Sequence, residues 1–309
     1  MTFVECFNQH ENILMEGALG ERLKREYHIS FDDNVAMASL VYSQAGRNAL
    51  SELWGGYIDI AKRFNLPFVA TTPTRRANRE RIESSDFSEK IISDNVDFLR
   101  EIQKKSGAKM FVGGLMGCKG DAYTAEGALP EKAAYDFHKW TCGHFLDAGV
   151  DFLYAGIMPS LFEAAGLAEA ADETNLPYII SFTIQKNGKL IDGTKISDAI
   201  AYIDESTRNK PLCYMTNCVH PKILFEALSQ PFNQNAAVQK RFRGIQANTS
   251  PLSYAELDGS VDLKTSSPKD FADDMIRLSE IVPIKIWGGC CGTDDRHIEC
   301  LAEKLNDGA

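Results

Sequence analysis

The chain has 309 residues, of which 44% are hydrophobic and 25% are charged, and its 33 basic and 43 acidic side chains give a net charge of -10. This composition is that of a globular protein, and an acidic chain without a Lys/Arg cluster argues against nucleic acid or an anionic membrane surface as partner. The N-terminus lacks the blocks of a signal peptide and no apolar run approaches the ~18 residues of a membrane span, so we expect a cytoplasmic protein. In that compartment the 8 cysteines are expected to be thiols or metal ligands.

Short apolar runs recur along the chain, and segments with the 3.6-residue periodicity of helices lie between them. Continuous apolar runs are typical of parallel strands that are buried on both faces. Helix boundaries support this alternation, since the segment 130–149 begins with proline and ends on glycine. Strands are expected at 12–15, 67–70, 109–112, 151–154, 177–181, 212–215, 244–247 and 283–287, and helices at 46–64, 130–149, 197–207, 221–229, 267–281 and 294–305.

The repeated strand and helix units predict a single domain, residues 1–309, with the α/β fold of a (β/α)8 TIM barrel. A doubly wound sheet is the alternative, but no Gly-x-Gly-x-x-Gly opens a helix after the first strand and the sequence contains no P-loop. The first connection, 17–65, contains a long stretch before its helix begins. Such a stretch is often a lid or a wall of the substrate site, and a surface loop without a role in binding is the alternative.

The ends of the predicted strands carry most of the candidate functional residues. In (β/α)8 barrels the active site lies at the carboxyl-terminal ends of the strands. Residues that are far apart in sequence are therefore expected to lie on one rim. The residues at these ends are Glu16, Gly17, Thr71, Thr72, Gly113, Gly114, Ala155, Gly156, Ser181, Asn217, Cys218, Asn248 and Gly288 to Cys291.

Two adjacent cysteines, Cys290 and Cys291, stand in the glycine-rich run 288–293 directly after the last strand. In a regular strand neighbouring side chains point to opposite faces, but the glycines let the backbone leave strand geometry and turn both sulfurs to one point. Cys218, at the end of the sixth strand, is the candidate third ligand on the same rim. Three thiolates with one open position predict a reactive Zn²⁺ site.

The same groups also allow other arrangements. With His220 as a fourth ligand, the metal site would be closed and structural. Cys290 and Cys291 could instead form a strained vicinal disulfide. The pair His297 and Cys300, three residues apart on the last helix, is interpreted as structural. A metal-storing or redox-sensing barrel is the alternative outside the enzymes.

An open zinc site with three thiolates can bind a substrate thiol and lower its pKa from ~8.5, so that the thiolate is present at neutral pH. Such a sulfur can attack a methyl group on a positively charged donor. Activation of water for hydrolysis is the other use of an open zinc site, but those sites usually have His and carboxylate ligands. The three cysteines therefore favour thiol chemistry.

The pair Asn217-Cys218, the run Gly288-Gly289-Cys290-Cys291-Gly292-Thr293 and the opening 13–20 resemble the homocysteine S-methyltransferase family. The resemblance extends from the first strand to the last helix. It implies a zinc-containing (β/α)8 barrel in which the three cysteines hold Zn²⁺ and the homocysteine sulfur takes the fourth position. The implied reaction moves a methyl group from a small activated donor to homocysteine, giving methionine. No catalytic group is expected beyond the zinc-bound substrate thiolate.

Two positions depart from the family pattern. The first strand ends in Glu16-Gly17, where the family usually has Asp-Gly, and the fourth ends in Ala155-Gly156, where many members have a Glu. Glu16 is still expected to hold the substrate ammonium group. A paralogous enzyme that acts on another thiol, or on a methylated sulfur or nitrogen compound, is the alternative. The expected substrate contacts are Glu16, Gly17, Thr72, Gly156, Asn217 and Asn248, with Glu163 and Arg75 as weaker candidates.

Overall fold

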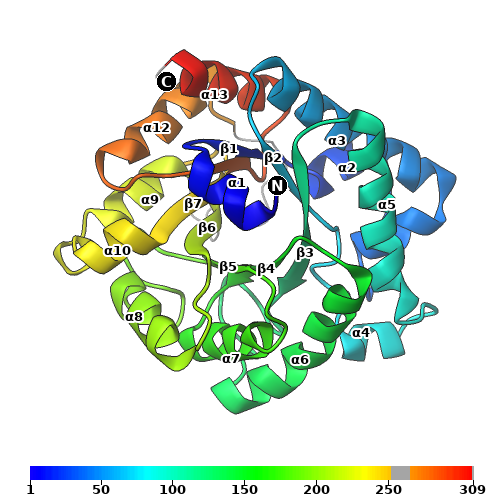
Figure 1. Ribbon diagram of the computed structural model, residues 1–309, viewed down its shortest axis with the longest axis horizontal. Coiled ribbons are helices and arrows are strands. Elements are labelled where there is room, and N and C mark those ends of the chain that lie inside the picture. Colours follow the sequence, from blue (N-terminus) through cyan, green and yellow to red (C-terminus); the bar gives the residue numbers. More distant parts are fainter. Residues whose placement is uncertain (252–264, 308–309) are drawn as a thin grey trace.

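The computed structural model describes residues 1–251 and 265–307, which form a closed barrel of parallel strands surrounded by helices (Figure 1). The strands follow one another around the barrel in chain order, and β1 pairs with both β2 and β8, which closes the sheet. The predicted (β/α)8 barrel is thus confirmed, and the doubly wound sheet is excluded. The strands are β1 (Ile13–Met15), β2 (Phe68–Thr71), β3 (Met110–Gly117), β4 (Phe152–Met158), β5 (Tyr178–Phe182), β6 (Cys213–Val219), β7 (Phe242–Ala247) and β8 (Ile286–Gly289).

Each helix predicted from periodicity is present. The segment 267–281 forms α12 (Pro268–Arg277), which then tightens into the 3-10 helix η3 (Leu278–Glu280). Within the described ranges, no helix is long and apolar enough to cross a membrane. The other helices are α1 (Phe3–Gln9), α2 (Gly20–Arg25) and the 3-10 helix η1 (Met37–Tyr42) within the long first connection, α3 (Gln44–Arg63), α4 (Arg79–Glu83), α5 (Lys90–Ser106), α6 (Glu131–Ala148), α7 (Leu161–Asp172), α8 (Ile196–Ser206), α9 (Pro221–Leu228), the 3-10 helix η2 (Pro231–Asn233), α10 (Ala236–Arg241) and α13 (Asp295–Asp307).

Helix α1 covers the amino-terminal end of the barrel (Figure 1). Its Phe3 stacks on Phe152 at the start of β4, with ring centroids 4.3 Å apart, within the apolar cluster that fills the barrel interior. The sequence periodicity missed this short helix, although Thr2 and Glu5 form a capping box that marks its start. Because apolar side chains fill this end, the carboxyl-terminal end of the strands is left for the functional site.

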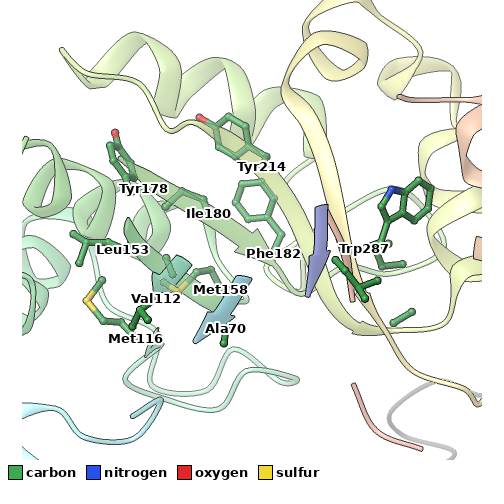
Figure 2. Close-up of a cluster of buried hydrophobic side chains, with 14 of the residues drawn as sticks. Ala70, Val112, Met116, Leu153, Met158, Tyr178, Ile180, Phe182, Tyr214 and Trp287 are labelled. Atoms are coloured by element: carbon green, nitrogen blue, oxygen red, sulfur yellow. The ribbon is translucent and has the colours of Figure 1, made fainter. Parts of the chain in front are cut away.

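A second apolar cluster lies between the strands and the surrounding helices (Figure 2). On β5, Ile179 belongs to the interior cluster, whereas Ile180 and Phe182 belong to the outer one. Phe182 stacks on Tyr214 of β6 with ring centroids 5.6 Å apart. Both faces of the strands are therefore buried, which explains why their sequences are continuously apolar rather than alternating.

Candidate functional site

Three cysteine sulfurs meet at the carboxyl-terminal rim of the barrel. Cys218 lies near the end of β6, and Cys290 and Cys291 directly follow β8. The three Sγ atoms all lie within 4.8 Å of one another. The Sγ of Cys290 is 2.7 Å from that of Cys218 and 4.0 Å from that of Cys291, and all three residues are free thiols. The barrel thus brings together the residues that the sequence predicted as metal ligands.

A bulge near the end of β6 determines where Cys218 lies. The pairing register with β7 shifts between Asn217 and Val219, and Cys218 has a φ of 58°, in the left-handed region. A residue other than glycine adopts this backbone at a cost of about 1 kcal/mol or more. In a regular strand Asn217 and Cys218 would point to opposite faces, but here both line the same cavity.

The Asn217 side chain holds this bulge against two neighbouring strands. Its Oδ1 accepts hydrogen bonds from the backbone N–H of Ile157 on β4, at 3.0 Å, and from the hydroxyl of Ser181 on β5, at 2.6 Å. Ile157 itself has a φ of 52° and lies in a second register shift, between β4 and β5. One amide therefore supports two strained strand ends, and we interpret Asn217 as a positioning residue for Cys218.

Hydrogen bonds fix the turn that carries Cys290 and Cys291. The backbone N–H of Cys290 donates to the carbonyl of Ala247 on β7 at 2.7 Å. The Thr293 hydroxyl donates to the Cys290 carbonyl at 2.7 Å and accepts from the backbone N–H of Ala18 at 2.9 Å. The turn is therefore tied to the loop after β1 and to the end of β7 by groups other than the thiols.

Replacing Gly292 in this turn with alanine is expected to destabilise the fold by about 1–3 kcal/mol. Gly292 has a φ of +83°, and an added Cβ would lie 2.0 Å from the Oγ1 of Thr249. Urea denaturation measures the change in the free energy of unfolding. The matched control is Gly143→Ala in α6, where an added Cβ meets nothing within 4 Å and should stabilise by about 0.5–1 kcal/mol. Equal effects of the two substitutions would contradict this explanation.

A cavity of about 240 Å³ opens beside the three sulfurs. Sites for drug-sized ligands are usually larger, at ~300–1,000 Å³, so this cavity suits a small substrate. Gly20 of α2 and Met37 of η1 lie in its lining, and the long first connection therefore forms part of the cavity wall. The predicted substrate contacts that line it are Glu16, Gly17, Thr72, Gly156, Asn217 and Arg75.

Glu16 is the buried carboxylate of this cavity and is only 2% exposed. Its Oε1 accepts hydrogen bonds from the backbone N–H and the hydroxyl of Thr71, at 3.1 and 2.7 Å. Its Oε2 has no hydrogen-bond partner among the described residues. Burial raises the pKa of Glu16 to about 7, although the bonds from Thr71 act in the opposite direction. The Oε2 atom is thus available to a polar group of a ligand in the cavity.

Two predicted substrate contacts, Glu163 and Asn248, are not among the described residues that line the cavity. Glu163 is fully buried, and its Oε1 accepts a hydrogen bond from the backbone N–H of Lys119 at 2.6 Å. Its Oε2 accepts from the N–H of Leu129 at 3.2 Å, and the Nε2 of His138 lies 3.3 Å from its Oε1. Glu163 therefore anchors the connection between β3 and α6 instead of touching the cavity.

The histidines considered as metal ligands have structural partners. The Nδ1 of His220 accepts a hydrogen bond from the backbone N–H of Lys222 and so caps α9, and burial lowers the pKa of His220 to about 4. The Nδ1 of His297 lies 2.7 Å from the Oδ1 of Asp294, and its Nε2 lies 3.1 Å from the Ser266 carbonyl. In the part of the chain that the structure describes, the ligand cluster contains the three cysteines alone.

Tyr123 belongs to the site although the sequence did not predict it. It lies on the connection between β3 and α6, lines the cavity, and hydrogen-bonds to Cys218. Hydrogen bonds from Cys290, Cys291 and Tyr123 hold the pKa of the Cys218 thiol well below its usual range, because they stabilise the thiolate. No local sequence pattern marks a tyrosine in an irregular connection.

Comparison with known proteins agrees with this geometry. A family model described as homocysteine S-methyltransferase matches residues 13–305. The structure is similar to that of the homocysteine methyltransferase MmuM from Escherichia coli in its metallated form, with a TM-score of 0.74, 18% sequence identity, and coverage of 97% of this chain and 98% of that one. The apo form of the same protein gives a TM-score of 0.66 at 19% identity, with 97% of each chain covered. At this identity the structural likeness concerns the fold.

Proposed function

Because the chain belongs to the homocysteine S-methyltransferase family, we propose that it transfers a methyl group from a small activated donor to the thiol of homocysteine, giving methionine. The observation that carries this proposal is the cluster of three cysteine sulfurs beside a small cavity whose lining also contains a buried carboxylate, Glu16. A thiol and an ammonium group at the two ends of one small molecule would match these two features.

The sulfur cluster fits Zn²⁺. With Zn–S bonds of ~2.3 Å, tetrahedral coordination separates the sulfurs by about 3.8 Å. The 4.0 Å between the Sγ atoms of Cys290 and Cys291 agrees with this value, and the 2.7 Å between Cys218 and Cys290 would have to widen by about 1 Å. When bound, Zn²⁺ would lower the pKa of a substrate thiol in the fourth position, so that the thiolate is present at neutral pH.

The residues of the chain position the two reactants. Glu16 accepts a hydrogen bond from the substrate ammonium through its Oε2, and Asn217 keeps Cys218 on the rim. The homocysteine thiolate then attacks the methyl carbon of the donor. A new sulfur–carbon bond forms as the bond between the donor and the methyl group breaks, and its electron pair leaves with the donor. Because a substrate thiol held at Zn²⁺ would release its proton to solvent before the transfer, no side chain has to act as general base.

A second function, methyl transfer to another thiol, is favoured by one feature of the cavity. Gly156 lines it where many family members carry a Glu, so no carboxylate reaches the cavity from this position. An added Cβ at Gly156 would lie 2.8 Å from the Cδ1 of Leu115, which shows that the wall is closely packed here. The other carboxylate of the lining, Glu21, already accepts a hydrogen bond from the backbone N–H of Gly292 and pairs with Arg25. Recognition of an ammonium group then depends on Glu16, and a thiol without that group would meet a less acidic cavity.

The two functions are separated by comparing homocysteine with 4-mercaptobutyrate, which has no amino group. Each thiol is tested with S-methylmethionine, S-adenosylmethionine, betaine and methylfolate as donors, and the methylated product is measured. A charged hydrogen bond contributes about 1.5–3 kcal/mol, so kcat/KM should be about 10- to 100-fold higher for homocysteine. If homocysteine has no advantage, the second function replaces the first.

A further inference from the structure

A second, larger cavity of about 430 Å³ adjoins the one beside the sulfurs. Arg75, Tyr123 and Ile157 line both, so the two cavities lie side by side. The second cavity lies between the loop after β2, the start of α4 and the connection after β3. Its basic lining residues are Arg75, Arg76, Arg81 and Lys119.

The positive charge of this basic cavity is only partly balanced. Lys119 pairs with Glu80, with the Nζ 2.8 Å from the Oε1. Among the described residues, no carboxylate forms an ion pair with Arg75, Arg76 or Arg81. The lining contains one carboxylate, Asp121, whose Oδ1 already accepts two backbone hydrogen bonds of 2.8 Å from its own loop. Three arginines without an ion-pair partner among the described residues thus line one cavity, in a chain whose net charge is -10.

The arginines are held in place by the surrounding backbone. The N–H of Gly117 donates to the carbonyl of Arg75 at 3.1 Å, and a Cβ on Gly117 would lie 2.7 Å from the Cγ of Arg75. Asn78 caps α4 by accepting a hydrogen bond from the N–H of Arg81 at 3.0 Å. Burial, Arg81 and Arg75 together lower the pKa of Arg76, because its charge is partly desolvated and repelled by its neighbours. An anion in the cavity would offset this repulsion.

We propose that the basic cavity binds a carboxylate or phosphate group of the methyl donor, while the methyl end of the same molecule enters the cavity beside the sulfurs. Guanidinium groups recognise both anions through paired, charge-assisted hydrogen bonds. The assignment to the donor rests on the proposed function, in which homocysteine occupies the smaller cavity between the sulfurs and Glu16. A donor that reaches from one cavity to the other carries its anionic group several bonds away from the methyl carbon.

Binding of two simple probes tests the cavity without any catalysis. Inorganic phosphate and glutarate are titrated into the purified protein and into Arg76→Gln and the double variant Arg76→Gln/Arg81→Gln. We expect at least one probe to bind, with affinity reduced about tenfold or more in the double variant. The stronger probe identifies the anion class. Arg208→Gln is the control, because Arg208 is 74% exposed and pairs with Asp172 outside both cavities. No binding, or equal binding by all proteins, would overturn the proposal.

Steady-state kinetics then links the cavity to the donor. In the double variant the KM of the donor should rise about tenfold or more, whereas the KM of homocysteine should stay within about twofold. The stronger probe should inhibit competitively against the donor and not against homocysteine. A rise in the KM of homocysteine alone would overturn the assignment to the donor. If methyl transfer to homocysteine is not found, the proposed function fails, while the probe titration still decides whether the cavity binds anions.

Discussion

Cys290→Ser is expected to remove the bound metal and to lower the rate of methyl transfer by about a thousandfold or more, because a serine hydroxyl does not replace a thiolate as zinc ligand. The fold should persist, since the turn is held by the backbone N–H of Cys290 and by Thr293 rather than by the thiol. The measurements are zinc content per chain after dialysis, the rate of product formation, and the circular dichroism spectrum.

Cys300→Ser is the matched control for this substitution. Cys300 is a free, half-buried thiol on α13, outside the ligand cluster and the cavity beside the sulfurs. This variant should keep full metal content and activity. If the Cys290→Ser protein forms product at the wild-type rate without zinc, the proposal that zinc activates the substrate thiol is wrong. A protein that loses zinc and activity only when Cys300 is replaced would place the metal elsewhere.

The barrel could be predicted because its strands are buried on both faces and its helices have clear periodicity. The predicted ends of several strands were wrong, because β3, β4 and β6 continue for several residues into sequence that contains glycine or polar side chains. In β4 and β6 these extensions contain the residues with positive φ, Ile157 and Cys218. Bulges of this kind depend on contacts between neighbouring strands, such as those of Asn217, and they leave no pattern in the sequence.

The cysteine cluster could be predicted because its residue types are distinctive and the barrel places them on one rim. The role of Glu163 could not, because its partners are backbone N–H groups of an irregular connection rather than a recognisable motif. That same connection carries Tyr123 and much of the basic cavity. Arg75 was predicted as one possible substrate contact, but the cavity shared by three arginines became visible only in three dimensions.

Glu16→Gln is expected to change the pH dependence of stability. Burial raises the pKa of Glu16 from 4.5 to about 7, so the folded state binds its proton more tightly than the unfolded state. Its favourable contribution to stability is therefore complete below pH 4.5 and is lost as the pH rises through about 7, a change of roughly 3 kcal/mol. Glutamine does not titrate. As the pH rises from 5 to 8, the free energy of unfolding of the variant should therefore increase relative to that of the wild type, as measured by urea denaturation at each pH.

The exposed Glu169 on α7 provides the control, because Glu169→Gln should show the same pH dependence as wild type. If Glu16→Gln and Glu169→Gln behave alike, Glu16 does not carry the buried proton. If only Glu16→Gln differs from wild type, the group with the raised pKa is Glu16 in the cavity beside the sulfurs. Release of the Glu16 proton upon ligand binding can then be measured.

The same substitution is expected to weaken homocysteine binding. An ammonium group at the Oε2 of Glu16 favours the ionised carboxylate, so binding should tighten as the pH rises through about 7. Replacing Glu16 with glutamine removes the charge pair and should raise the KM of homocysteine about 10- to 100-fold with little change in kcat. The thiol without an amino group, mercaptobutyrate, should show a much smaller change in KM, which separates the titration of Glu16 from that of the thiol. Equal changes for both thiols would show that Glu16 does not meet the ammonium group and would favour a substrate that lacks one.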